Sequence, residues 1–152
     1  MTISPDRRLL ASHPAHLLAF GFGAGLVPKA PGTAGTLVAI PLFAALMYTP
    51  EIVHYVVLLA LFLIGLPVCA RANRALGVDD HGSIVWDEIV AFMLVLEFTP
   101  LAWHWWLAAF LLFRLFDAKV GGGFGVMLDD LLAALYAIAA LKILQWLITA
   151  TW

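Results

Sequence analysis

Carboxylates are the side chains whose spacing most directly suggests chemistry in this sequence. Seven of the ten acids fall in three short stretches, which are DDHGSIVWDE (79–88), the end of FRLFD (113–117) and the end of GGGFGVMLDD (121–130). Hard oxygen ligands of this kind suit Mg²⁺, which typically takes one or two carboxylates with waters and a substrate phosphate. If the fold brings the three stretches to one level, the sequence predicts a divalent-cation site.

Two of these groups have an equally good structural explanation. Asp129 and Asp130 could cap a helix that starts near residue 126, because acids are favoured at a helix N-terminus. Arg114 and Asp117 stand three residues apart and could form an ordinary salt bridge on a helix face. Both readings stay open at the level of sequence.

The other polar residues divide more clearly. Asp87 and Glu88 lie about one turn into an expected helix, where a plain cap is less natural, so this pair favours function. Asp79 is expected to be a solvated loop acid. The histidines and tryptophans expected at a membrane interface are His13, His16, His54, His104, Trp103, Trp105, Trp106, Trp146 and Trp152.

Two glycine-rich runs accompany the acids. PGTAGT (31–36) and GGGFG (121–125) each precede an expected helix, where backbone N–H groups could hold phosphate at the positive helix end. Glycines also serve tight turns and close helix packing, so either run alone is weak evidence. Together with the acids and the bases Lys29 and Arg114, they predict a phosphate beside a metal ion, and hence phosphoryl chemistry on a membrane substrate.

The composition indicates where such a site must sit. The chain has 152 residues, of which 64% are hydrophobic and only 12% are charged, against roughly 45–50% and 25% in soluble domains. Its mean hydropathy is +1.00. These values exclude an ordinary soluble enzyme, a disordered chain and a nucleic-acid binder, and they predict an integral membrane protein. The single cysteine, Cys69, excludes a disulfide framework.

The expected architecture is all-α, a polytopic membrane bundle forming one domain over 1–152. Strands are not expected, because apolar and polar residues do not alternate. Residues 9–27 are expected to form an N-terminal amphipathic or partly inserted helix, followed by a loop over 27–36. About five membrane-embedded helices are expected, although only the second and fifth easily reach the roughly 20 residues that a span needs. Their apolar segments are 37–49, 52–70, 84–98, 101–116 and 126–148.

Basic residues predict the orientation. With five spans, seven of the eight lysines and arginines fall on one side, which the positive-inside rule assigns to the cytoplasm. The seven basic residues are Arg7, Arg8, Lys29, Arg71, Arg74, Arg114 and Lys119. The acids of the three stretches described above crowd the same side.

Four runs together resemble a known family. GFGAGLVPKAPGTAGTL (21–37), DDHGSIVWDE, FRLFD and GGGFGVMLDD are similar in order and spacing to the phosphatidylglycerophosphatase A family of bacterial inner-membrane enzymes. The resemblance covers most of the chain. It implies Mg²⁺-dependent hydrolysis of phosphatidylglycerophosphate to phosphatidylglycerol and inorganic phosphate, in the inner membrane with the site facing the cytoplasm.

The resemblance also implies roles for individual residues. The expected metal ligands are Asp87, Glu88, Asp129 and Asp130. The catalytic set adds Asp80, His81 and Asp117. The residues expected to bind substrate are Lys29, Thr33, Thr36, Arg114 and Lys119.

The chain departs from the family pattern at one point. The family usually continues after FRLFD with a Lys-Pro-x-Pro segment and a basic, aromatic stretch, whereas here FDA runs directly into KVGGG. The interpretation is that residues are missing from the printed chain between Ala118 and Lys119. A Cα–Cα distance well above 3.8 Å at this junction is therefore predicted.

Other functions remain as alternatives. The chain could act on another lipid phosphate, as a phosphatase or transferase, or it could be a small cation transporter. A cysteine phosphatase is excluded, because only four residues separate Cys69 from Arg74 and no phosphate-binding glycines lie between them. The Asp-x-Asp-x-Thr and Pro-Ser-Gly-His patterns are absent too, so a metal-activated water fits better than a covalent phosphoenzyme. No nucleic-acid partner is expected.

Overall fold

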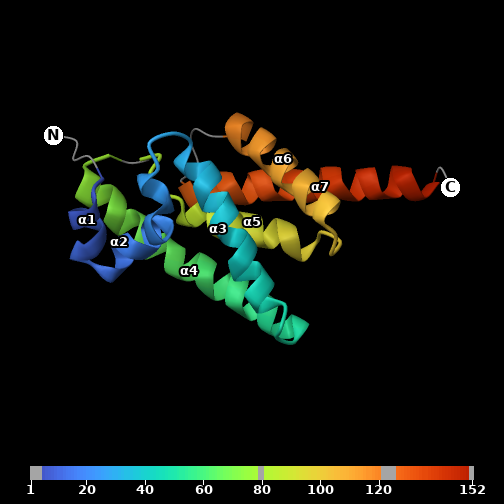
Figure 1. The fold of residues 1–152 in the computed structure, drawn as a ribbon, viewed down its shortest axis with the longest axis horizontal. Coiled ribbons are helices and arrows are strands. Elements are labelled where there is room, and N and C mark those ends of the chain that lie inside the picture. The colour runs from blue at the N-terminus through green and yellow to red at the C-terminus, as the bar shows by residue number, and fades with distance from the viewer. Residues whose placement is uncertain (1–4, 79–80, 121–125, 151–152) are drawn as a thin grey trace.

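The computed structural model describes the backbone of residues 5–78, 81–120 and 126–150, and their side chains except at 118–120 and 126. Every regular element in these ranges is a helix, which confirms the all-α prediction (Figure 1). The helices are α1 (Arg7–Ser12), α2 (Pro14–Ala19), the 3₁₀ helix η1 (Gly21–Leu26), α3 (Pro31–Leu46), α4 (Glu51–Leu76), α5 (Trp86–Glu97), α6 (Trp103–Val120) and α7 (Val126–Ala150).

Helix α5 is the centre of the bundle. It packs against α3, α4, α6 and α7, and nine of its 12 residues are buried. Twelve helical residues rise only about 18 Å, less than the roughly 30 Å of a hydrocarbon core. Helix α5 is therefore enclosed by the neighbouring helices, which contact most of its side chains.

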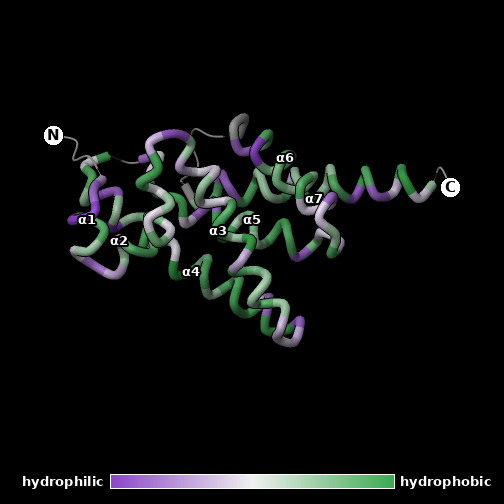
Figure 2. The backbone as a smooth tube through the Cα atoms, viewed as in Figure 1, coloured by the Kyte–Doolittle hydropathy of each residue, from purple (hydrophilic) through white to green (hydrophobic). Residues whose placement is uncertain are grey.

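Two helices are long and apolar enough to cross a membrane. They are α4, over Glu51–Leu76, and the Met127–Ala150 part of α7. Only 28% and 22% of their most apolar windows are buried inside the protein, so both present apolar side chains outward. Figure 2 shows hydrophobic residues along both helices. The expected count of about five membrane-embedded helices is thus supported for the second and fifth segments.

The expected single helix over 9–27 is wrong. The chain breaks at His13, which is extended (φ −159°, ψ 141°), because the residue before a proline is disfavoured in the helical region. It breaks again at Phe20 (φ −86°, ψ 16°), which ends α2, and within the 3₁₀ helix that follows Phe22 and Gly23 have left-handed φ values of 58° and 107°. Three short helices result.

The expected loop over 27–36 is also shorter than predicted. Helix α3 begins at Pro31 and includes the Gly/Thr run. A proline at the first helical position has a suitable φ and needs no N–H partner. Because the first turns of α3 consist of small residues, this end of the helix can approach neighbouring side chains closely.

The predicted gap in the backbone after Ala118 is not found. Helix α6 runs from Trp103 to Val120 and continues through positions 118 and 119, which are consecutive in the full sequence. The connection between the FRLFD and GGGFG runs is therefore short in this chain.

Candidate active site

Three carboxylates from two helices meet in the bundle. Asp87 and Glu88 lie in the first turn of α5, and Asp130 lies near the start of α7. One oxygen from each side chain can be chosen so that all three lie within 4.8 Å of one another. The condition set by the sequence, that acids distant in the chain come together, is met by these three residues. We call them the carboxylate cluster.

The cluster is largely buried, and some of its carboxylate oxygens receive no hydrogen bond from the described residues. Asp87 is 4% exposed and Asp130 is 7% exposed. The backbone N–H of Glu88 donates to Asp87 Oδ1 at 3.0 Å. Within the described part of the chain, Glu88 Oε2 and Asp130 Oδ2 are buried with no hydrogen-bond partner. Buried carboxylate oxygens are costly unless they meet donors or a cation.

The donor set suits a hard divalent cation. Its three side chains supply only carboxylate oxygens, and Mg²⁺ prefers oxygen ligands at about 2.0–2.1 Å. Opposite ligands of such an ion are about 4 Å apart, close to the spacing of the cluster. Asp87, Glu88 and Asp130 could therefore hold Mg²⁺ and leave other positions for water or phosphate.

Helix α6 brings a cation to the edge of the cluster. Arg114 Nη1 donates to Asp117 Oδ2 at 2.7 Å, and the same nitrogen lies 3.8 Å from Glu88 Oε1. The simple salt bridge considered from the sequence is thus present, but it also adjoins the cluster. Asp117 orients Arg114 and adds a further negative charge nearby.

The start of α3 closes another side of the site. A Cβ atom at Gly32 would overlap Glu88 Oε1 and lie 3.2 Å from Arg114 Nη1. The first N–H groups of a helix have no partner within the helix, and this end carries a partial positive charge. The expected proximity of the PGTAGT run to the acids is confirmed.

The electrostatics of Glu88 reflect this crowding. Helix α5 lies outside the two candidate membrane-spanning helices. Burial is the main cause of a raised Glu88 pKa, from 4.5 to about 10, with Asp87 and Asp117 acting in the same direction and Arg114 opposing them. Without an added cation, the Glu88 carboxyl therefore holds its proton more tightly than a solvated glutamate does.

Several of the expected site residues are not members of the carboxylate cluster. Asp129 is half-buried and is not among the three clustered carboxylates, because consecutive helical side chains point about 100° apart. The His81 ring accepts from the Ser83 N–H at 3.1 Å. Asp79 and Asp80 lie outside the described residues, as does the GGGFG run.

The expected substrate-binding residues also differ in placement. The buried Thr36 hydroxyl donates to the Gly32 carbonyl at 2.9 Å within α3. Thr33 is half-buried and Lys29 is exposed. The side chain of Lys119 lies outside the described residues.

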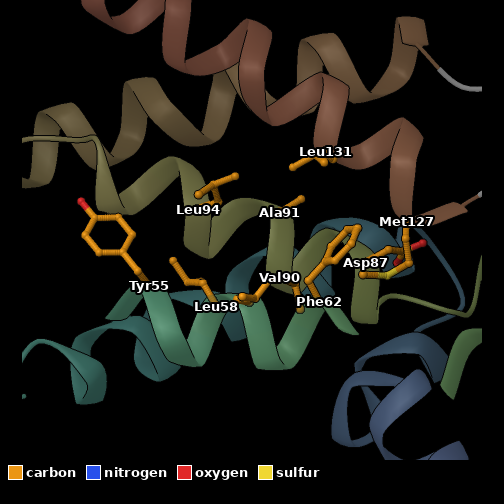
Figure 3. Close-up of a pocket in the computed structure, with 10 residues that line it drawn as sticks. Tyr55, Leu58, Phe62, Asp87, Val90, Ala91, Leu94, Met127 and Leu131 are labelled. Atoms are coloured by element: carbon orange, nitrogen blue, oxygen red, sulfur yellow. The ribbon is translucent and has the colours of Figure 1, made fainter. Parts of the chain in front are cut away.

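One feature of the site was not recognised from the sequence. A groove of about 350 Å³ lies between α4, α5 and α7, and Asp87 is part of its lining (Figure 3). The other described lining residues are apolar except Tyr55. The apolar segments carried no signal of it, because core and groove side chains have the same composition.

A second unrecognised feature lies at the far end of α5. His54 Nδ1 is 3.0 Å from Glu97 Oε2, and the two side chains are 12% and 6% exposed. The sequence suggested only an interfacial role for His54. The pairing depends on α4 packing beside α5, which the sequence alone does not specify.

Comparison with known proteins decides the family. The family model described as "Phosphatidylglycerophosphatase A" matches residues 17–145. The chain belongs to the phosphatidylglycerophosphatase A family. Membership confirms the resemblance drawn from the four sequence runs, and it places the carboxylate cluster in a family of phosphatases.

Individual relatives of the family agree with this assignment. A phosphatidylglycerophosphatase A of Haemophilus influenzae is 42% identical over 156 residues, covering 94% of this chain and 96% of the relative. The Escherichia coli K12 protein of the same name is 39% identical, covering 93% and 92%. A Bacteroides thetaiotaomicron protein named "Putative phosphatidylinositol-3-phosphatase" is 34% identical, covering 87% and 94%. No solved structure matches this chain.

Proposed function

We propose that this protein hydrolyses phosphatidylglycerophosphate to phosphatidylglycerol and inorganic phosphate in an Mg²⁺-dependent reaction. The observation that carries the proposal is the convergence of Asp87, Glu88 and Asp130 beside Arg114, in a chain of the phosphatidylglycerophosphatase A family. The substrate comes from the names of the Haemophilus and Escherichia relatives. The metal comes from the chemistry of the carboxylate cluster.

The carboxylate cluster would hold the metal. Bound there, Mg²⁺ would supply Lewis-acid polarisation of a phosphoryl oxygen and offset the charge of the phosphomonoester. The three carboxylates converge on one place, and Arg114 lies at their edge, 3.8 Å from Glu88 Oε1. A divalent ion would therefore relieve their mutual repulsion.

The surrounding groups would bind and orient phosphate. Arg114 offers guanidinium donors at the edge of the cluster, held by its 2.7 Å hydrogen bond to Asp117. Guanidinium donors suit phosphate oxygens in a two-point contact. The N–H groups at the start of α3 lie on the adjoining side, beside Gly32. Burial of Asp87 and Asp130 would limit the water that reaches the reacting phosphate.

The proposed setting is the bacterial inner membrane, with several helices embedded. The supporting features are the apolar α4 and α7 and the one-sided distribution of lysine and arginine. The carboxylate cluster lies at the helix ends toward that basic side, which would be the cytoplasmic one. A lipid head group could then reach the cluster while its acyl chains stay in the bilayer.

A second candidate is hydrolysis of another lipid phosphate. The Bacteroides relative favours it, because its name gives phosphatidylinositol 3-phosphate as the substrate. Phosphomonoester chemistry would be the same, and only head-group recognition would differ. A cation transporter is a weaker alternative, since a path would need acids at several depths, whereas Asp87, Glu88 and Asp130 form one cluster.

One assay separates these functions. Purified protein in detergent is given phosphatidylglycerophosphate, phosphatidic acid or phosphatidylinositol 3-phosphate, each with Mg²⁺ or with EDTA, and phosphate release is measured. The expected result is fastest release from phosphatidylglycerophosphate and loss of release in EDTA. Faster turnover of another lipid would overturn the proposed substrate, and full activity in EDTA would overturn the proposed Mg²⁺ dependence. The Asp87→Asn protein measures any contaminating phosphatase.

A further inference from the structure

We propose that the groove between α4, α5 and α7 holds one acyl chain of the substrate, with the chain's head-group end at Asp87. This inference rests on the proposed function, because the occupant is a lipid phosphate. It adds a binding site for the part of the substrate that does not react.

The lining of the groove suits a hydrocarbon chain. Its volume of about 350 Å³ falls within the usual range for ligand pockets, about 300–1,000 Å³. Helix α4 contributes Leu58 and Phe62, α5 contributes Ala91 and Leu94, and α7 contributes Met127. Apolar walls of this kind disfavour a polar ligand, because its lost hydrogen bonds with water would not be replaced.

The groove is continuous with the carboxylate cluster. Among the lining residues that the structure describes, Asp87 is the only charged one, and the same carboxylate belongs to the cluster with Glu88 and Asp130. In Figure 3, Asp87 and Met127 lie at one end and Tyr55 at the other. A molecule with a phosphate at one end and an apolar tail would therefore match both parts at once.

The dimensions favour a single chain over a helix of another protein. From Asp87 to Leu94, α5 rises about 10 Å, so the groove would hold only part of a long acyl chain. A helix with its side chains is about 10–12 Å across, too thick for a space of about 350 Å³. Two of its walls, α4 and α7, are also the helices able to cross a membrane.

Tyr55 marks the far end of the groove. Its hydroxyl donates to Glu51 Oε1 at 3.2 Å, and the residue is 41% exposed. The phenol is therefore directed to a surface partner, so the distal part of the groove stays apolar. The remainder of a long chain would leave the groove here.

The test narrows the groove and compares substrates that differ only in chain length. Ala91→Phe inserts a ring into the buried lining, and Leu94→Phe does so at a half-buried position two turns from Asp87. The matched control is Ala60→Phe, which places the same ring on an exposed position of α4 outside the groove. Phosphate release is measured with dipalmitoyl and dibutanoyl phosphatidylglycerophosphate.

The readout is the ratio of kcat/KM for the long-chain substrate to that for the short-chain substrate. We expect this ratio to fall about tenfold in Ala91→Phe and Leu94→Phe, the effect of losing contact with about two methylenes. Ala60→Phe should keep the native ratio. The proposal that the groove binds an acyl chain would be overturned if correctly folded Leu94→Phe kept the native kcat/KM ratio. It would also be overturned if the ratio fell equally in Ala60→Phe.

Binding separates this inference from the proposed function. Radiolabelled dipalmitoyl phosphatidylglycerophosphate retained by protein in EDTA, where no turnover is expected, should be about tenfold weaker in Leu94→Phe than in Ala60→Phe. Native protein that retains the lipid but releases no phosphate with Mg²⁺ would contradict the proposed function and leave the groove standing. Equal retention by the two variants would contradict the groove itself.

Discussion

Gly32 lies so close to Glu88 that a Cβ atom at position 32 would overlap the carboxylate oxygen Oε1. The same Cβ would lie 3.2 Å from Arg114 Nη1. One glycine at the start of α3 thus permits an acid from α5 and a base from α6 to meet. Adding a single methyl group would push against all three helices at the proposed site.

Gly32→Ala should therefore lower activity more than stability. We expect kcat/KM for phosphatidylglycerophosphate to fall roughly a hundredfold, because displaced phosphate-binding donors lose their alignment. Gly82→Ala is the matched control, since nothing lies within 4 Å of a Cβ at position 82. Equal activity of the two variants would show that Glu88 can move without consequence.

Asp87→Asn should abolish phosphate release while the protein stays folded. The amide keeps the shape of the side chain but removes a charge needed for the cation. In EDTA its thermal unfolding midpoint should equal or exceed that of the native protein, because repulsion within the cluster falls. The control is Asp6→Asn, which keeps the cap on Leu9 N. Native turnover by Asp87→Asn would make Asp87 a structural acid.

The metal-free protein should lose stability as the pH rises. The Glu88 pKa is raised from 4.5 to about 10 in the folded chain, so the folded state binds this proton more tightly than the unfolded state does. The free energy of unfolding in EDTA should then fall from about pH 5 toward pH 9. Glu88→Gln should flatten this dependence, and Mg²⁺ should raise stability most at the alkaline end. A flat native profile in EDTA would contradict the crowding of the cluster.

Arg114 and Asp117 should behave as one unit. Arg114→Gln removes the guanidinium and should lower kcat/KM roughly a hundredfold, whereas Asp117→Asn should cost less because it only loosens the 2.7 Å contact. The double variant should resemble Arg114→Gln alone, since Asp117 has no guanidinium left to orient. Additive losses would instead indicate that Asp117 acts independently, for example on water or metal.

Most helices and several residues of the candidate site could be predicted from the sequence. The apolar segments 52–70 and 126–148 correspond to α4 and α7, because length and hydropathy are properties of the local sequence. The acids of DDHGSIVWDE and GGGFGVMLDD could be recognised as candidate site residues, because carboxylates in so apolar a chain are costly unless they are paired or bind a cation. Family membership followed from the order of the same runs.

Only the tertiary structure decided which candidates meet. Asp130 joins Asp87 and Glu88, whereas Asp129 does not, and that choice depends on how α7 is rotated against α5. The contact of Gly32 with Glu88 and the apolar groove have the same origin. Hydrophobic pattern and helix propensity act within a segment, but the rotation and approach of packed helices depend on side chains far apart in the chain.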